Sequence, residues 1–201
     1  MTMRAALLVL MLTPALAAAQ EPYPEEFEDE AAQGDAVGDG AASVDPLDRL
    51  FDELADENLT NPRRVQARIG EIWSHSGSAS MDLLLTRGRE ATEAEEYEKA
   101  VDHLTALTRL APEFAEGWNA RATAHYLNDE YWFAMADIQR ALTIEPRHFG
   151  ALLGLGVILE RTGDERGALV ALRAALAINP HLVEARQAVE RLAPKVDGRD
   201  I

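Results

Sequence analysis

The fold of this chain is decided by residues 81–180, which read MDLLLTRGREATEAEEYEKAVDHLTALTRLAPEF (81–114), AEGWNARATAHYLNDEYWFAMADIQRALTIEPRH (115–148) and FGALLGLGVILERTGDERGALVALRAALAINP (149–180). Aligned in this way, the three windows place Pro112, Pro146 and Pro180 at intervals of 34 residues. A period of this length predicts helical hairpins stacked side by side rather than one closed catalytic domain.

Other residue classes recur with the same period. A large apolar residue stands four positions before a small one in the first half of each window, and a second small residue follows in the second half. The large residues are Leu84, Trp118 and Leu152; the small residues are Gly88, Ala122 and Gly156, then Ala100, Ala134 and Ala168. Antiparallel helices approach closely where both carry small side chains, and the large residues fill the space beside them. Each proline lacks a backbone N–H and disfavours helix before it, so it ends the second helix of a hairpin.

This pattern is similar to the tetratricopeptide repeat (TPR), whose 34-residue unit carries W-x2-L-G-x2-Y, A-x3-F and P. The resemblance covers 100 of the 201 residues. It implies an all-α fold, a right-handed superhelical stack of helix-turn-helix hairpins. Arg87 and Arg121 stand where the pattern prefers leucine. We expect each arginine to lay its methylene groups on apolar surface and to keep its charged end in water.

The first 44 residues differ from the repeats in composition. Residues 1–19 have Arg4, an apolar run interrupted by Pro14, and small residues at the end, which predicts a secretory signal peptide cleaved after about Ala19. Cleavage after Ala17 is the alternative site, and an uncleaved anchor or a buried helix is the alternative interpretation of the segment. Residues 20–44 carry eight acidic residues and no basic one. We interpret them as a disordered acidic linker, with a lure for calcium or a basic protein as the alternative.

Residues 45–80 are expected to form an N-terminal helical hairpin. Asp45-Pro46 and Asn61-Pro62 each place a capping residue before a proline, which predicts helices over 46–57 and from 62 to about His75. We expect this hairpin to cover the exposed apolar end of the first repeat, because an open end of such a stack is prone to aggregation.

Three repeats follow, at 81–114, 115–148 and 149–180. Their helices are expected at about 81–94, 96–110, 115–128, 130–144, 149–162 and 164–178. Gly163 is predicted to take the left-handed conformation that ends a helix, and Asn128 to do the same in the middle repeat. Residues 181–194 are expected to form a C-terminal capping helix and residues 195–201 a tail.

No catalytic, metal or cofactor site is predicted. The chain has no cysteine, and its five histidines include no H-E-x-x-H motif and no pair at i, i+4. A nucleophile elbow and a phosphate-binding loop are also missing from the sequence. The net charge of −16 would repel phosphate-rich partners, so nucleic-acid binding is not expected.

The resemblance implies where a partner binds. In TPR proteins the first helices of successive hairpins line a concave groove that accepts a peptide. Carried onto this chain, the candidate groove residues are Leu85, Arg89, Thr92, Asn119, Thr123, Tyr126, Leu153, Val157 and Glu160. Arg89 and Asn119 alone do not complete the Lys/Asn/Arg set with which some relatives hold the terminal carboxylate of a peptide.

The expected function is therefore that of a non-enzymatic protein- or peptide-binding TPR scaffold in the cell envelope, the periplasm, with no membrane span after signal cleavage. The alternative is a self-associating structural module, a homo-oligomer whose groove is unused. Trp132 and Phe133, beside Tyr131, bear on this choice. We expect them to pack in the core against the neighbouring repeat; an exposed contact patch is the other interpretation.

Overall fold

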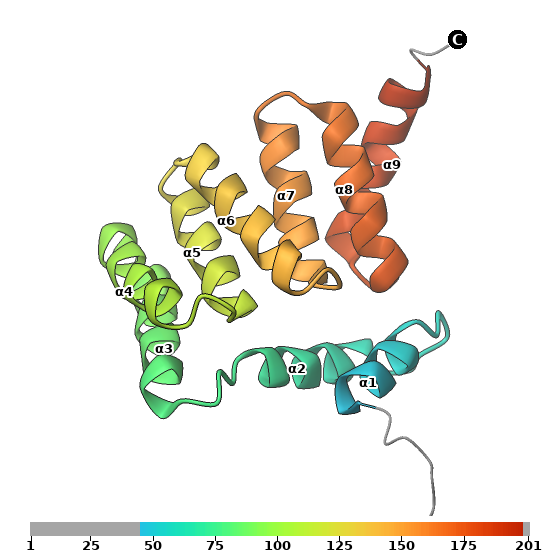
Figure 1. Cartoon of the computed structure of the whole chain (residues 1–201). Helices are drawn as coiled ribbons and strands as arrows, with labels where there is room; N and C mark the ends of the chain where they lie inside the picture. Colours follow the sequence, from blue (N-terminus) through green and yellow to red (C-terminus); the bar gives the residue numbers. More distant parts are fainter. Residues whose placement is uncertain (1–44, 199–201) are drawn as a thin grey trace, which may run out of the picture. The chain divides into compact units, whose positions relative to one another are not determined.

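The computed structural model describes residues 45–198, so the predicted signal peptide and acidic linker lie outside the described residues. The described part is built from helices alone and contains no strand (Figure 1). The helices are α1 Pro46–Leu54, α2 Pro62–Trp73, α3 Ala79–Glu93, α4 Tyr97–Leu110, α5 Ala115–Leu127, α6 Tyr131–Ile144, α7 Phe149–Arg161, α8 Glu165–Ile178 and α9 Val183–Asp197. Between residues 45 and 198, no helix is both long and apolar enough to cross a membrane.

Helices α3 to α8 form the three predicted hairpins, and α9 packs against α8 at the end of the stack (Figure 1). The small residues of the repeat pattern lie where the two helices of a hairpin meet. A Cβ atom built on Gly88 would lie 2.4 Å from Cγ of Leu104, which is itself fully buried in α4. Packing density in protein interiors leaves no room for an added methyl group at such a point. The all-α TPR-like fold predicted from the period is therefore confirmed.

The turn within each hairpin uses one left-handed residue. Glu95, Asp129 and Gly163 have φ values of 59°, 58° and 91°. The next residue in each turn donates its backbone N–H to a carbonyl of the preceding helix at 2.8 Å. The expectation for Asn128 is wrong by one residue, because Asn128 keeps φ at −88° and Asp129 makes the turn. Aspartate tolerates this conformation better than most residues with a Cβ.

Replacing Glu95 with glycine is expected to raise the free energy of unfolding by about 0.5–1 kcal/mol, because a residue with a Cβ is strained at positive φ and glycine is not. Urea unfolding followed by circular dichroism measures the change. Gly163→Ala, at the equivalent turn, is the matched control and should lower stability by a similar amount. A destabilised Glu95→Gly protein would contradict this account of the turn.

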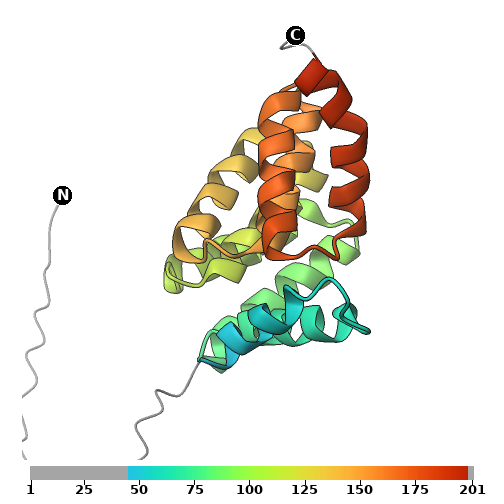
Figure 2. The same ribbon diagram turned by 90° about the vertical axis from the view of Figure 1, so that its right-hand side faces the viewer.

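The N-terminal hairpin packs in a different place from the one predicted. The apolar residues of α1 and α2 form a small core together with Trp73, Phe149 and Ile178. Polar contacts extend this attachment: Arg147 pairs with Asp48 at 2.7 Å, and Gln66 donates to Asn179 at 3.3 Å. The hairpin therefore lies along one end of the later helices (Figures 1 and 2), and the expectation that it covers the first repeat is wrong. The large apolar side chains at the start of α7 and the end of α8 are what it buries.

The C-terminal helix also differs from its predicted range. It begins at Val183 and runs through Pro194 to Asp197, so part of the expected tail is helical. Proline removes one backbone hydrogen bond within a helix. Leu192 and Val196, both buried against α8, hold the last turns in place.

Two aromatic side chains expected in the core are exposed. Trp132 is 82% and Phe133 62% solvent-accessible. Tyr131 and Ala134 take the inward positions of α6 instead: Ala134 is fully buried, and the Tyr131 ring lies 5.9 Å from that of Tyr126. Because α6 turns about 100° per residue, the two residues between them lie on the outer side of the helix, and the Phe133 ring stacks on that of His125 with centroids 5.4 Å apart.

Arg121 also departs from its expectation, since its charged end is not in water. The guanidinium makes two hydrogen bonds of 2.7 Å to the carboxylate of Asp137, whose side chain is 6% exposed. Its remaining nitrogen donates to the hydroxyls of Thr105 and Thr108. The position that the repeat pattern gives to leucine is thus filled by a buried ion pair. Arg87 is exposed, as expected.

Candidate peptide-binding groove

A hollow of about 260 Å³ lies between the first helices of the second and third repeats, α5 and α7. Its lining residues are Asn119, Ala122, Thr123, Tyr126, Ile138, Gly150, Leu153, Gly154, Val157 and Ile158. Five of the nine candidate groove residues are among them: Asn119, Thr123, Tyr126, Leu153 and Val157. The structure thus brings together the three candidates from α5 and two of the three from α7.

The chemistry of this hollow is that of a binding site for an apolar group. None of its lining residues carries a charge, and an apolar surface with a few polar groups is typical of ligand pockets. Gly150 and Gly154 leave part of α7 bare. A Cβ atom on Gly154 would make only an ordinary contact, at 3.6 Å, with Cδ1 of Ile138. Because both glycines line the hollow, a larger side chain at Gly154 would occupy part of it.

The other four candidates lie elsewhere. Leu85 is 1% exposed and packs in the core with Ala120 and Ala124 of α5, so its assignment to the groove surface is wrong. Those two alanines let α5 approach α3 and cover the leucine. Thr92 donates its hydroxyl to the carbonyl of Gly88 at 2.9 Å.

The two charged candidates are held in ion pairs. Glu160 binds the Arg191 guanidinium, with its two carboxylate oxygens each 2.8 Å from one nitrogen. Arg89 pairs with Glu116 at 2.5 Å. Neither side chain lines the hollow between α5 and α7.

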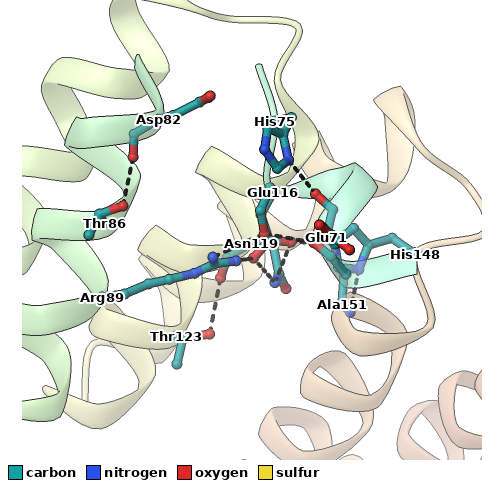
Figure 3. A network of polar contacts seen from close by, with 12 residues as sticks. Glu71, His75, Asp82, Thr86, Arg89, Glu116, Asn119, Thr123, His148 and Ala151 are labelled. Atoms are coloured by element: carbon teal, nitrogen blue, oxygen red, sulfur yellow. Dashed lines mark hydrogen bonds and ion pairs between the residues drawn. The ribbon is translucent and has the colours of Figure 1, made fainter. Parts of the chain in front are cut away.

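Glu116, in the first turn of α5, is a buried carboxylate that is not among the residues predicted from the sequence (Figure 3). Its Oε1 accepts from Arg89, and its Oε2 lies 2.9 Å from Nε2 of His148. The amide nitrogen of Asn119 lies 3.3 Å from both oxygens. One feature of the sequence points to this site: Glu116 and Asn119 lie three residues apart and therefore on one face of the helix.

The tautomer of His148 follows from its contacts. Its Nδ1 accepts the backbone N–H of Ala151 at 3.1 Å, which caps the start of α7. A nitrogen that accepts carries no proton, so Nε2 carries the hydrogen and donates it to Glu116. The Trp73 ring stacks on the imidazole with centroids 4.1 Å apart and planes at 13°. Trp73, the last residue of α2, thus covers the network.

Glu116 is ionised at neutral pH. Burial raises the pKa of its carboxyl, but hydrogen bonding to His148 and the charge of Arg89 outweigh burial and hold that pKa below its ordinary value of 4.5. A carboxyl whose pKa is lower in the folded state stabilises the fold above its unfolded-state pKa. The stabilisation is lost as the pH falls through the folded-state value.

Replacing Glu116 with glutamine is therefore expected to lower the free energy of unfolding by about 1–3 kcal/mol at neutral pH, as expected for lost hydrogen bonds to a charged group. Below an ordinary carboxyl pKa the difference from wild type should shrink, because the wild-type carboxyl becomes protonated as well. Urea unfolding from about pH 7 down to about pH 3 measures it. Glu113→Gln, which alters an exposed carboxylate paired with Arg140, is the control. A difference that stays constant with pH would contradict the assignment.

Comparisons with known proteins agree with this architecture. No protein-family model matches the chain. A TPR repeat-containing protein of Rhizobium etli is 34% identical over 196 residues, which cover 96% of this chain and 95% of that protein. The small glutamine-rich tetratricopeptide repeat-containing protein 2 of Saccharomyces cerevisiae is 29% identical over 114 residues, 57% of this chain and 33% of its own length.

Solved structures are similar over the repeat region. The TPR domain of Arabidopsis OM64 superposes with a TM-score of 0.55 at 25% identity, over 56% of this chain and 93% of that one. The first TPR of Spaghetti (RPAP3), bound to an HSP90 peptide, superposes with a TM-score of 0.56 at 17% identity, over 58% of this chain and 93% of that one. The Yersinia enterocolitica type III secretion chaperone SycD, in complex with a peptide of YopD, superposes with a TM-score of 0.55 at 14% identity, over 59% of this chain and 95% of that one. With a relative matched along nearly its whole length and the repeat stack of α3 to α8, this chain belongs to the tetratricopeptide repeat proteins.

Proposed function

We propose that this chain is a non-enzymatic scaffold of the cell envelope that binds a protein or peptide in the groove between α5 and α7. The observation that supports it is the hollow itself, where two neighbouring repeats combine an apolar floor with the amide of Asn119 and the hydroxyl of Thr123. The peptide-bound structures of Spaghetti and SycD share the fold, and an extended groove is a recurrent peptide-binding surface.

A variant that fills the groove tests this proposal. Gly154→Leu adds a side chain in the hollow with no close contact at its Cβ, so it should fold and should lose the partner captured by the wild-type chain from an envelope extract. Gly70→Leu is the matched control, since it adds the same side chain to a helix position with no atom within 4 Å. The capture should persist in the control. If Gly154→Leu retains every captured partner, the groove is not the binding site.

The envelope location rests on the composition of residues 1–19. Fractionation of cells producing the complete chain tests it directly. We expect the protein in the periplasmic fraction with a new N-terminus at about Gln20. Retention of Met1 in the cytoplasmic fraction would contradict the location and leave the groove proposal standing.

Self-association is a second candidate function, and the exposed pair Trp132 and Phe133 favours it. Adjacent exposed aromatic side chains are frequent at the centres of protein interfaces. Light scattering on the mature chain at micromolar concentration separates the two proposals. A dimer that dissociates in the double variant Trp132→Ala with Phe133→Ala would support this candidate, and a stable monomer would remove it.

A further inference from the structure

Two groups beside the groove could attract an anion, the Arg89 guanidinium and the Asn119 amide, and both already bind the carboxylate of Glu116. Arg89 gives one guanidinium nitrogen to Glu116 and another to the hydroxyl of Ser74, at 2.5 and 3.0 Å. Asn119 directs its amide nitrogen at the same carboxylate. Figure 3 shows Arg89, Asn119 and His148 gathered around Glu116. The carboxylate of a ligand would find this position, next to Arg89 and Asn119, already occupied by the negative charge of Glu116.

We propose that Glu116 sets the specificity of the groove: its carboxylate occupies Arg89 and Asn119, so the groove binds an uncharged internal segment of a partner through a phenylalanine-sized side chain and rejects acidic segments and chain termini. This inference rests on the proposed function and names the class of peptide that the groove takes.

Glu116 is placed so that a ligand cannot displace it. It is 8% exposed and is held from its inner side by His148, which is itself 2% exposed under the ring of Trp73. Removing one partner of such a group would leave buried hydrogen-bonding atoms without partners. The net charge of −16 on the whole chain adds a long-range repulsion against acidic partners.

The remaining polar groups indicate how a neutral segment is held. Since the amide nitrogen of Asn119 is taken, the carbonyl oxygen of this side chain is what it offers to a ligand. Thr123 donates its hydroxyl hydrogen to the backbone carbonyl of Asn119 at 3.1 Å, which leaves the hydroxyl oxygen of Thr123 as an acceptor. Both groups suit the backbone N–H groups of an extended peptide.

The size of the hollow indicates the side chain. A cavity of about 150 Å³ with apolar walls is enough to hold benzene, and the hollow between α5 and α7 measures about 260 Å³. The hollow is partly open, so an aromatic ring of the partner can enter it while the peptide backbone of the partner stays at the rim. Charged residues are absent from the lining, so an acidic or basic side chain would lose its hydration without gaining a partner.

Synthetic peptides test the proposal on the mature chain. The probes are fluorescein-labelled Gly/Ser peptides with a central phenylalanine, closed by acetyl and amide groups, and the same peptides carrying glutamates and a free C-terminal carboxylate. Fluorescence polarisation should show that the neutral peptide binds about tenfold more tightly than the acidic one. This is the ratio expected when the charged groups of the acidic peptide find no hydrogen-bond donors in the groove. Replacing the central phenylalanine with serine should remove binding.

Two variants test the ratio: Glu116→Gln tests the role of Glu116 itself, and Thr123→Lys is the positive control for the assay. Glu116→Gln frees Arg89 from a charged partner and should shift the neutral-to-acidic affinity ratio about tenfold toward the acidic peptide. Thr123→Lys adds an uncommitted cation at an exposed position and should shift the ratio in the same direction without altering the buried network. If a folded Glu116→Gln chain leaves the ratio unchanged, Glu116 does not set the specificity and the proposal is wrong, whether or not Thr123→Lys shifts the ratio.

Other outcomes separate this inference from the groove proposal. Equal binding of both peptides by the wild-type chain, abolished by Gly154→Leu, would overturn the specificity and leave the groove intact. Peptide binding that Gly154→Leu does not weaken would overturn both. Tighter binding of the neutral peptide by a chain lacking residues 20–44 would show that the acidic segment competes for the groove, which contradicts the rejection of acidic segments.

Discussion

Replacing Arg121 with alanine is expected to lower the free energy of unfolding by about 3–5 kcal/mol, the range for breaking a buried ion pair by removing one partner. The Asp137 carboxylate is 6% exposed and receives two hydrogen bonds from this one guanidinium. Without Arg121 it would remain buried with His125 Nε2 as the nearest basic nitrogen, at 3.9 Å. The hydroxyls of Thr105 and Thr108 would lose a shared donor as well. Urea unfolding at neutral pH measures the loss.

Arg173→Ala is the matched control for this prediction. Arg173 pairs with Asp197 at 2.8 Å, but both side chains are more than half exposed, so its removal should cost no more than about 1 kcal/mol. The double variant Arg121→Met with Asp137→Leu should recover most of the stability, because apolar residues of similar volume can replace a buried pair. Equal losses for Arg121→Ala and Arg173→Ala would contradict the role assigned to the buried pair.

Gly156→Ala is expected to destabilise the third hairpin by about 1–3 kcal/mol, the usual cost of overpacking. The added Cβ would lie 2.6 Å from Cγ of Leu172 and 3.4 Å from the backbone oxygen of Ala168. Leu172 is fully buried, so it could move away only by disturbing its packed neighbours. The two helices of the hairpin, α7 and α8, would have to separate.

Gly154→Ala, in the same helix, should have the opposite effect and raise stability by about 0.5–1 kcal/mol, because alanine is the better helix former. Its Cβ meets only Cδ1 of Ile138, at 3.6 Å. Thermal unfolding of the two single variants measures both changes. If the two substitutions move the midpoint in the same direction, the assignment of Gly156 to the helix contact and of Gly154 to the groove is wrong.

The helices could be predicted because the 34-residue period encodes local packing. The small side chains at Gly88 and Gly156 allow the two helices of one hairpin to approach each other. Each proline marks the end of a helix a few residues away. The position of the N-terminal hairpin could not be predicted in this way. It depends on the stacking of Trp73 on His148 and on the bond between Gln66 and Asn179, contacts between residues far apart in the sequence that leave no periodic signal.

The groove could be predicted only where equivalent positions of adjacent repeats are exposed to the same surface. Asn119 and Leu153 occupy one position of successive repeats and line the same hollow, whereas Leu85, at that position in the first repeat, is covered by the alanines of α5. Glu116 was missed because a lone glutamate in a helix is normally solvated, and only the three-dimensional arrangement shows what it binds. Trp132 and Phe133 were misplaced because aromatic residues at helical spacing are usually buried.

Site-specific photo-cross-linking in intact cells tests the claim that a partner enters the groove between α5 and α7. The cross-linking amino acid is placed at Thr123 in the groove and, for comparison, at the exposed Val170 of α8. We predict a cross-linked product with a second polypeptide from Thr123, absent from Val170 and lost when Gly154→Leu fills the hollow. The same product from Val170, or its survival in the Gly154→Leu chain, would contradict the claim.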